Sequence, residues 1–159
     1  MVPWTRRDLG GFHMLWGDSE VIWWRGYPLS WAQSRELLNT LLERCEGMDG
    51  GLGWWRIEER DGGQTVGNVL LQPYDDSEVE LGLHIVRSHW KKGIGSEAAM
   101  GAVRYGFTTL GVERIMAIVH GANAPSKRIL QKMAFRNDGF VMHQGMPHER
   151  FVKERPGND

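Results

Sequence analysis

The sequence predicts an α+β fold, and three observations lead to this prediction. A capped amphipathic helix begins after Ser30, and a β-hairpin turns through Arg60–Gly63. A third segment, Val79–Val86, alternates like a strand and then turns into a helix at Gly93 and Gly95. Helices and antiparallel strands within one chain of this size are typical of a sheet covered by helices.

Length and composition narrow the class of protein. The 159 residues suit one domain, 1–159, that can bury a core without disulfides. The net charge of −1 argues against nucleic-acid binding through a basic surface, and no apolar run approaches membrane-spanning length. The single cysteine, Cys45, fits a reducing compartment, and Arg6, Arg7 and Asp8 interrupt any signal-peptide pattern. We therefore expect a soluble cytoplasmic protein without nucleic-acid or membrane partners.

The first elements are a strand and two helices. Phe12–Trp16 is predicted to be the first strand, and Asp18 is predicted to cap a short helix that continues through Trp24. The next helix has a capping box at Ser30-Trp31-Ala32-Gln33 and stops at Gly47. Its apolar stripe includes Cys45, so we expect a buried structural thiol there rather than a nucleophile.

The middle of the chain predicts three strands. Leu52–Glu59 and Thr65–Gln72 form the hairpin, and Val79–Val86 follows. Apolar residues of Val79–Val86 alternate with a second set that faces the other side of the sheet. Glu80 and His84 belong to this second set, about 13 Å apart at about 3.3 Å per residue. No side chain lies between them, which leaves room for a ligand against the strand.

The remaining segments predict a helix, a strand, a second helix and a hairpin. Gly93–Leu110 is rich in small residues that allow a helix to approach a sheet closely, and Ile115–Val119 has the β-branched character of a central buried strand. Asn123-Ala124-Pro125-Ser126 opens the second helix, with proline in its first turn. The closing hairpin is predicted as two strands and a turn: Phe140–Gln144, Arg150–Lys153 and Gly145-Met146-Pro147.

The turn at Gly93 and Gly95 predicts an anion site. The first N–H groups of a helix lack internal partners and the helix dipole is positive there, so a phosphate is the expected ligand. Lys91 and Lys92 precede the glycines, whereas a Walker A lysine follows them. The dinucleotide pattern G-x-G-x-x-A also fits, with Glu113 twenty residues after Gly93. Glu113 precedes a predicted strand instead of ending one, which weakens that alternative.

Two motifs resemble those of the GNAT N-acetyltransferases. Trp90–Ala98 resembles the pyrophosphate-binding loop Gln/Arg-x-x-Gly-x-Gly/Ala, with Trp90 in the first place as in the RimJ/RimL-type branch. Lys91 departs from the small residue that usually follows. Asn123–Phe135 resembles Asn-x-x-Ser with its trailing Lys-x-Gly-Phe, and Ala134 replaces the glycine. The two motifs occur in the family's order and spacing.

This resemblance implies a GNAT fold that binds acetyl-CoA as cosubstrate. The implied fold is a central mixed, mostly antiparallel sheet of about seven strands, splayed in the middle and flanked by about four helices. The pantetheine would lie along Val79–Val86, and the loop amides would take the pyrophosphate. Solvated surface charge is an equal alternative for the lysines. The residues implied in coenzyme binding are Ile85, Val86, Lys91, Lys92, Gly93, Ile94, Gly95, Ser96, Asn123, Ser126 and Lys127.

Glu80 is the expected catalytic base, because it matches an acidic position ten residues before the loop in many RimJ/RimL-type sequences. A carboxyl group with a pKa near 4.3 needs desolvation or a water relay for this role. His84, with its better intrinsic pKa, is the reserve base. Ser126 is the expected donor to the departing thiolate. A salt-bridged carboxylate, a structural histidine and a helix-capping serine are the respective alternatives.

The expected acceptor is a primary amine. At pH 7, presenting an α-amine of pKa about 8 in its neutral form costs about 1.4 kcal/mol, against about 4.6 kcal/mol for a lysine-like amine, which favours a protein or peptide N-terminus. Trp24, Tyr27 and Trp31 are expected to line the acceptor site with Glu80 and His84, and core packing or a homodimer interface is the alternative. An antibiotic-like or polyamine-like acceptor and a non-catalytic coenzyme A-binding module remain open. The histidine spacing predicts no metal site.

Overall fold

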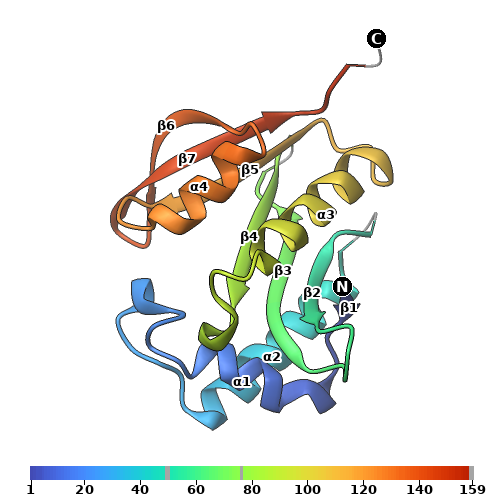
Figure 1. Ribbon diagram of the computed structural model, residues 1–159, viewed down its shortest axis with the longest axis vertical. Coiled ribbons are helices and arrows are strands. Elements are labelled where there is room, and N and C mark those ends of the chain that lie inside the picture. Colours follow the sequence, from blue (N-terminus) through green and yellow to red (C-terminus); the bar gives the residue numbers. More distant parts are fainter. Residues whose placement is uncertain (49–50, 76, 158–159) are drawn as a thin grey trace.

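The computed structural model describes residues 1–48, 51–75 and 77–157. At its centre is a seven-stranded sheet in the order β1-β2-β3-β4-β5-β7-β6 (Figure 1). β4 and β5 are parallel, and the other described pairs are antiparallel, which confirms the predicted mixed, mostly antiparallel sheet. The strands are β1 (Val2–Pro3), β2 (Gly53–Glu58), β3 (Thr65–Pro73), β4 (Val79–Ile85), β5 (Arg114–His120), β6 (Arg136–His143) and β7 (Met146–Glu154).

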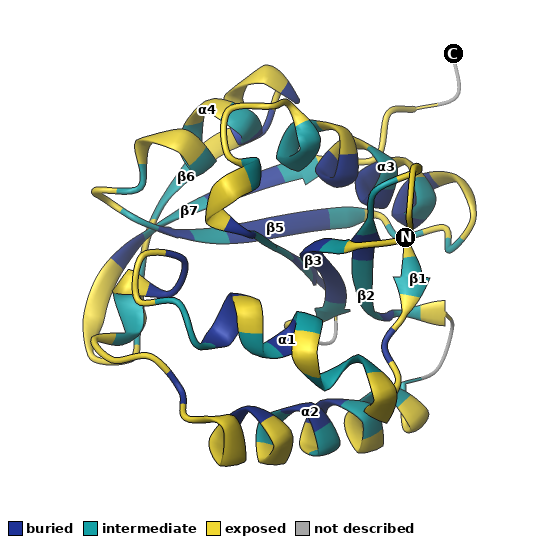
Figure 2. Ribbon diagram, turned by 60° about the horizontal axis from the view of Figure 1, so that its bottom comes forward, coloured by how far each residue is buried: buried dark blue, intermediate teal, exposed yellow. Residues whose placement is uncertain are grey.

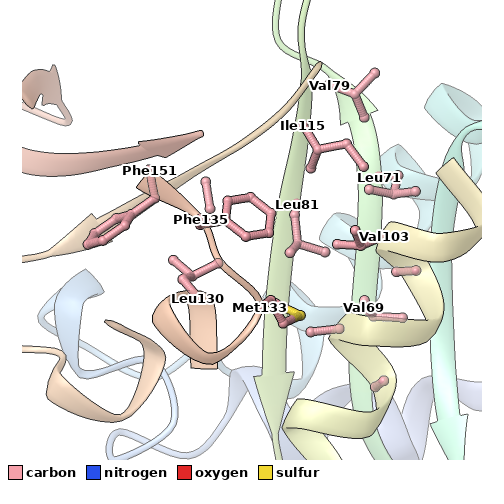
Figure 3. Close-up of a cluster of buried hydrophobic side chains, with 14 of the residues drawn as sticks. Val69, Leu71, Val79, Leu81, Val103, Ile115, Leu130, Met133, Phe135 and Phe151 are labelled. Atoms are coloured by element: carbon pink, nitrogen blue, oxygen red, sulfur yellow. The ribbon is translucent and has the colours of Figure 1, made fainter. Parts of the chain in front are cut away.

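Two helices cover each face of the sheet (Figure 2). α1 (Leu9–Trp16) and α2 (Trp31–Glu46) lie on one face, and α3 (Ile94–Thr108) and α4 (Ala124–Lys132) lie on the other. Each pair of helices buries its own hydrophobic cluster, and the cluster under α3 and α4 is mostly aliphatic (Figure 3). None of the described helices is long and apolar enough to cross a membrane.

The close packing of α3 on the sheet follows from its small residues. Ile115 of β5 is fully buried, as predicted for a central strand. A Cβ atom added to Gly106 would lie 3.0 Å from Ile115 Cδ1, so the helix could not lie this close with a larger residue there. The predicted helix, buried strand and Pro125-containing second helix are therefore confirmed.

The predicted strand at Phe12–Trp16 is wrong, because this segment belongs to α1. Phe12, Leu15 and Trp16 recur at helical spacing and are almost completely buried. Gly11 weakens the helical signal in the sequence, yet a Cβ atom there would lie 2.8 Å from Thr65 Cβ. The glycine that obscures the helix is thus what lets it approach β3.

The segment after α1 is also less helical than predicted. The Asp18 carbonyl accepts hydrogen bonds from the N–H groups of Val21 and Ile22, which form a turn. A short 3-10 helix, Trp23–Arg25, follows and ends at Gly26 with φ 87°. A single helix from Asp18 through Trp24 is therefore wrong.

The predicted capping box of α2 is confirmed. The Ser30 hydroxyl accepts from Gln33 N–H, the Gln33 side chain accepts from Ser30 N–H, and Gly47 follows the last turn. Cys45 is half-buried instead of buried, because it lies near the end of a helix whose last turn is largely exposed.

The closing hairpin is longer and its turn tighter than predicted. Gln144 and Gly145 form the turn with φ angles of 50° and 77°, a geometry that matches the twist of a two-residue hairpin. Met146 and Pro147, predicted in the turn, instead begin β7. The proline fits there because β5 pairs with β7 only as far as His148, so β5 offers no acceptor that would need an N–H group at position 147.

Candidate active site

The parallel pair β4–β5 separates soon after it begins. Val79 and Glu80 pair with Ile115 and Met116, but no further described residue of β4 pairs with β5. β4 continues beside β3, and β5 continues beside β7 over its full length. The two halves of the sheet therefore diverge, as Figure 1 shows, and we call the space between the diverging backbones of β4 and β5 the gap. This is the splayed sheet that the resemblance implied.

The alternating hydrogen bonds of β4 determine which backbone groups face this gap. Val86 N–H donates to Val66 O over 2.9 Å, so Val86 already serves the β3 side. In an antiparallel pair the neighbouring residue turns its N–H and C=O to the opposite side, which directs those of Ile85 into the gap. The Trp90 indole N–H donates to the Ile85 carbonyl over 2.7 Å. Of the two expected backbone contacts, Ile85 is the one whose amide faces the gap.

The glycine turn lies against the open half of β4. Gly93 has φ 82° and directly precedes α3, and Lys91 has φ 63°. A Cβ atom on Gly95 would lie 3.2 Å from Leu83 Cδ2 and 3.4 Å from Ile129 Cδ1. The start of α3 is thus held close to both β4 and α4. The N–H groups of the first turn, Ile94 to Ser96, can serve an anion at this position, which fits a pyrophosphate.

The cationic side chains expected at the coenzyme have different surroundings. Lys91 and Lys92 are exposed beside the glycine turn. Lys127 instead donates to Glu149 Oε1 over 2.8 Å and to the Gly121 carbonyl over 2.6 Å. Its ammonium group is therefore already neutralised by a carboxylate, which leaves Lys91 and Lys92 as the better phosphate partners.

The start of α4 has the predicted local geometry. Asn123 Oδ1 accepts from Ser126 N–H over 3.2 Å and caps the helix. This bond orients the first turn of α4, in which the Ser126 side chain is half-buried. Asn123 consequently has a structural role whether or not it also binds a ligand.

Glu80 lies on the α1–α2 face of the sheet in a chain of hydrogen bonds. Gln72, its cross-strand neighbour on β3, donates to Glu80 Oε2 over 2.7 Å. Trp54 Nε1 in turn donates to Gln72 Oε1 over 3.1 Å. These contacts fix the carboxylate orientation and satisfy one of its oxygens. No sequence motif marks Trp54 or Gln72, although the register of β3 with β4 could have placed Gln72 opposite Glu80.

His84 occupies a less polar environment on the same face. Burial lowers the pKa of its imidazole to about 4, so the ring is neutral at physiological pH. Its Nδ1 atom is buried without a hydrogen-bond partner in the described part of the chain. A neutral imidazole can accept a proton, but this low pKa makes His84 a weak base.

Only part of the expected aromatic lining meets at His84. The Trp24 ring lies 6.3 Å from the His84 ring between centroids, whereas the exposed Trp31 contacts His13, and Arg25 lies over Tyr27. Trp16, which the sequence analysis assigned to a strand and not to the site, lies 4.9 Å from the His84 ring. Trp16 could have been found only by recognising α1 as a helix.

A buried ion cluster closes the other end of the gap. Glu78, 5% exposed, directly precedes β4 and accepts from Arg150 of β7 and Arg114 of β5. Arg150 also pairs with Asp138. Three strands are thereby joined where β4 and β5 still pair. No local sequence pattern indicates this cluster, because Glu78 and Arg150 are 72 residues apart.

The dinucleotide alternative is not supported by this topology. β4 has an antiparallel neighbour in β3, unlike the strands of a doubly wound parallel sheet. Glu113 precedes β5 and pairs with Arg155 at the surface, so it does not end a strand beside the glycine turn. Among the described residues, no group of three histidine, cysteine or acidic side chains is placed to hold a metal.

Known proteins share this sequence pattern and this topology. A family model described as acetyltransferase (GNAT) domain matches residues 1–136. The uncharacterized N-acetyltransferase YoaA of Bacillus subtilis is 35% identical over 106 residues, which cover 62% of this chain and 59% of YoaA. The chain thus spans less than two thirds of that relative's length.

Solved structures have the same fold. A GNAT-family acetyltransferase from Bacillus anthracis has a TM-score of 0.79 at 21% identity, covering 94% of this chain and 89% of that chain. The aminoglycoside acetyltransferase AAC(6')-Ib in complex with coenzyme A has a TM-score of 0.77 at 17% identity, covering 96% and 92%. At these identities the likeness shows the fold alone. Because the family model matches most of the sequence, the chain belongs to the GNAT acetyltransferase domain family.

Proposed function

We propose that this protein is an acetyl-CoA-dependent N-acetyltransferase that transfers the acetyl group directly to a primary amine. The observation that best supports this function is the gap between β4 and β5, with the glycine turn at its open end. Ile85 provides a backbone N–H that faces the gap, and the first turn of α3 provides N–H groups for the pyrophosphate. The coenzyme A complex of a structural relative is consistent with this assignment.

Residues from different parts of the sheet and from α4 have separate roles in the transfer. When bound, acetyl-CoA supplies the acetyl group as a reactive thioester. Ile85 N–H polarises the acetyl carbonyl from the gap. Glu80, oriented by Gln72, takes the proton of the attacking amine directly or through one water. Ser126 donates a hydrogen bond from its hydroxyl to the departing thiolate, which with a pKa of about 8.5 can leave without full protonation. The acceptor nitrogen gains the acetyl carbon as the carbon–sulfur bond breaks.

The preferred acceptor is the α-amine of a protein or peptide. Such an amine is far more often neutral at pH 7 than a lysine-like amine. A weak base such as Glu80, held by one hydrogen bond from Gln72, or the weakly basic His84 can therefore remove its proton more easily. Trp90 supports placement in the RimJ/RimL-type branch. A small-molecule acceptor is the second candidate, since one structural relative is named an aminoglycoside acetyltransferase. The homodimer and the cytoplasmic location stay predictions.

Glu80→Gln tests the catalytic part of this function. The amide retains an oxygen that can accept from Gln72, so the fold should be preserved while the base is lost. We expect kcat for amine acetylation to fall about 100-fold with little change in KM for acetyl-CoA. Glu43→Gln is a matched control, because its side chain is exposed on α2, on the other face of the sheet from the glycine turn.

Thermal unfolding with and without acetyl-CoA, combined with an activity assay, distinguishes an acetyltransferase from a protein that only binds coenzyme A. Stabilisation of wild-type protein by acetyl-CoA without turnover of any amine would identify a non-catalytic coenzyme A-binding module. Equal kcat values for Glu80→Gln and wild type would remove Glu80 as the base. A melting temperature unaffected by saturating acetyl-CoA would contradict the proposed function itself.

A further inference from the structure

The Trp90 side chain folds back from the segment before the glycine turn onto the edge of β4 that faces the gap. Its indole N–H donates to the Ile85 carbonyl over 2.7 Å, although the residue is 42% exposed. Val86 N–H donates to Val66 O, so the N–H and C=O of Ile85 both point away from β3. The indole therefore occupies a hydrogen-bond acceptor that a ligand pairing with this edge would use.

The hydrogen bond to Ile85 is the specific contact that holds the Trp90 ring. Within the described part of the chain, this ring belongs to neither hydrophobic cluster. Trp54 also donates a hydrogen bond from its indole, but its ring packs against the cluster beneath α1 and α2. The backbone next to Trp90 is held independently, because the N–H groups of His89 and Trp90 donate to carbonyls of the preceding turn. The indole can therefore move into solvent without disturbing the core or the turn.

The order of backbone groups along β4 determines which part of the coenzyme meets this carbonyl. In each residue the N–H precedes the C=O, so the Ile85 carbonyl lies nearer the glycine turn than the Ile85 N–H does. In the proposed function the pyrophosphate binds at that turn and the acetyl carbonyl accepts from Ile85 N–H. The pantetheine amide nearest the thioester then lies on the turn side of the acetyl group. Its N–H needs an acceptor, and the Ile85 carbonyl is the next one on this edge in that direction.

We propose that the Trp90 indole and the pantetheine arm compete for the Ile85 carbonyl, so that acetyl-CoA displaces the indole when it binds. A strand-like arm brings its N–H nitrogen to within about 3 Å of the carbonyl oxygen, and the indole with its fused rings already occupies that position. This inference rests on the proposed function and adds Trp90 as a residue that sets the affinity for the coenzyme. Return of the indole to Ile85 favours release of coenzyme A after the transfer.

Trp90→Phe tests the competition, because it retains an aromatic ring and removes the N–H. The variant should bind acetyl-CoA about fivefold more tightly than the wild type, measured as Kd by isothermal titration calorimetry. A side chain that only supported the turn would give the opposite sign, since its loss would weaken binding. ADP has a pyrophosphate but no pantetheine, so its inhibition constant should be the same in both proteins.

Trp55→Phe is the matched control. Trp55 lies on β2, and its ring packs on Tyr105 of α3 rather than on the edge of β4. This control should leave the Kd of acetyl-CoA unchanged. Unchanged or weaker binding of acetyl-CoA by Trp90→Phe, or an equal change in the binding of ADP, would overturn the competition while leaving acetyl transfer intact. Failure of the wild type to bind acetyl-CoA would instead remove the underlying function.

Hydrogen exchange at the indole of the wild type decides even if Trp90→Phe does not fold. The Trp90 indole N–H, followed by NMR, should exchange faster when acetyl-CoA is bound, because it has lost its partner. In the same samples, Ile85 N–H should exchange more slowly. An indole N–H that is equally protected with and without acetyl-CoA would show that the coenzyme does not displace it, and would overturn the competition.

Discussion

The two ends of the β4–β5 pair differ in the interactions that they make. At the closed end, the strands pair through Val79 and Glu80, and buried Glu78 accepts from arginines of β5 and β7. At the open end, the Ile85 amide faces a gap, and a glycine turn brings further N–H groups beside it. The contrast teaches that the sheet is fastened at one end, so that its other end can stay open for a ligand.

Breaking the closed end should have the largest effect on stability. Arg150→Met leaves the Glu78 carboxylate 5% exposed with only Arg114 as a charged partner. We expect a loss of about 3 kcal/mol in the free energy of unfolding, because one partner of a buried ion pair is removed. Urea denaturation measures this loss.

A matched control and a double variant sharpen this first prediction. Arg155→Met removes the partner of Glu113, whose side chain is 72% exposed, and should cost less than about 1 kcal/mol. Glu78→Met combined with Arg150→Met should recover stability relative to Arg150→Met alone, since no charge is left buried. Equal losses in Arg150→Met and Arg155→Met would mean that the closed end is not fastened by this cluster.

At the open end, His84 should make stability depend on pH. Its pKa of about 4 in the folded protein lies below the ordinary value of 6.5, so the unfolded chain takes up the proton first as pH falls. Stability is therefore complete above about pH 6.5 and is lost toward pH 4. At pH 5 the loss is about 2 kcal/mol, at 1.4 kcal/mol for each pH unit below 6.5.

His84→Phe provides the comparison, because it keeps an aromatic ring beside Trp16 but cannot titrate. Unfolding free energies of both proteins at pH 7.5 and pH 5 isolate the histidine, since the other groups contribute equally. We expect wild type to lose more stability than His84→Phe between the two pH values. The same loss in both proteins would show that His84 is not held neutral by burial.

A substitution in the glycine turn should have a smaller effect on stability, and it can distinguish backbone strain from a loss of acetyl-CoA binding. Gly93→Ala places a side chain at φ 82°, which costs about 1 kcal/mol although no atom lies within 4 Å of the new Cβ. Displaced loop amides should also raise KM for acetyl-CoA about fivefold. Gly62→Ala is the control, with φ 100° and the same open surroundings in the β2–β3 hairpin. It should cost similar stability without changing KM, and a KM change common to both would argue against an anion site at Gly93.

Local signals made much of the open end predictable. The two glycines, the Asn123 cap and the alternation of β4 each depend on neighbouring residues, so the sequence alone predicts all three. The α1 helix was missed because Phe12–Trp16 is a short, largely apolar run whose period is ambiguous and whose flanking Gly11 disfavours a helix.

The closed end could not be predicted in the same way. Glu78 and Arg150 come together only because the strand order places β7 between β5 and β6. The contact between Trp16 and His84 likewise depends on how α1 packs against β4. Such contacts are set by tertiary packing, for which a single sequence has no periodic signal.

Amide hydrogen exchange, resolved by residue and measured with and without acetyl-CoA, tests the gap most directly. Ile85 N–H faces the gap, whereas Val86 N–H already donates to Val66 O. Acetyl-CoA should slow exchange at Ile85 and at Ile94 to Ser96, and should leave Val86 nearly unchanged. Protection that appears elsewhere in the chain, with Ile85 exchanging at the same rate in both samples, would contradict coenzyme binding between β4 and β5.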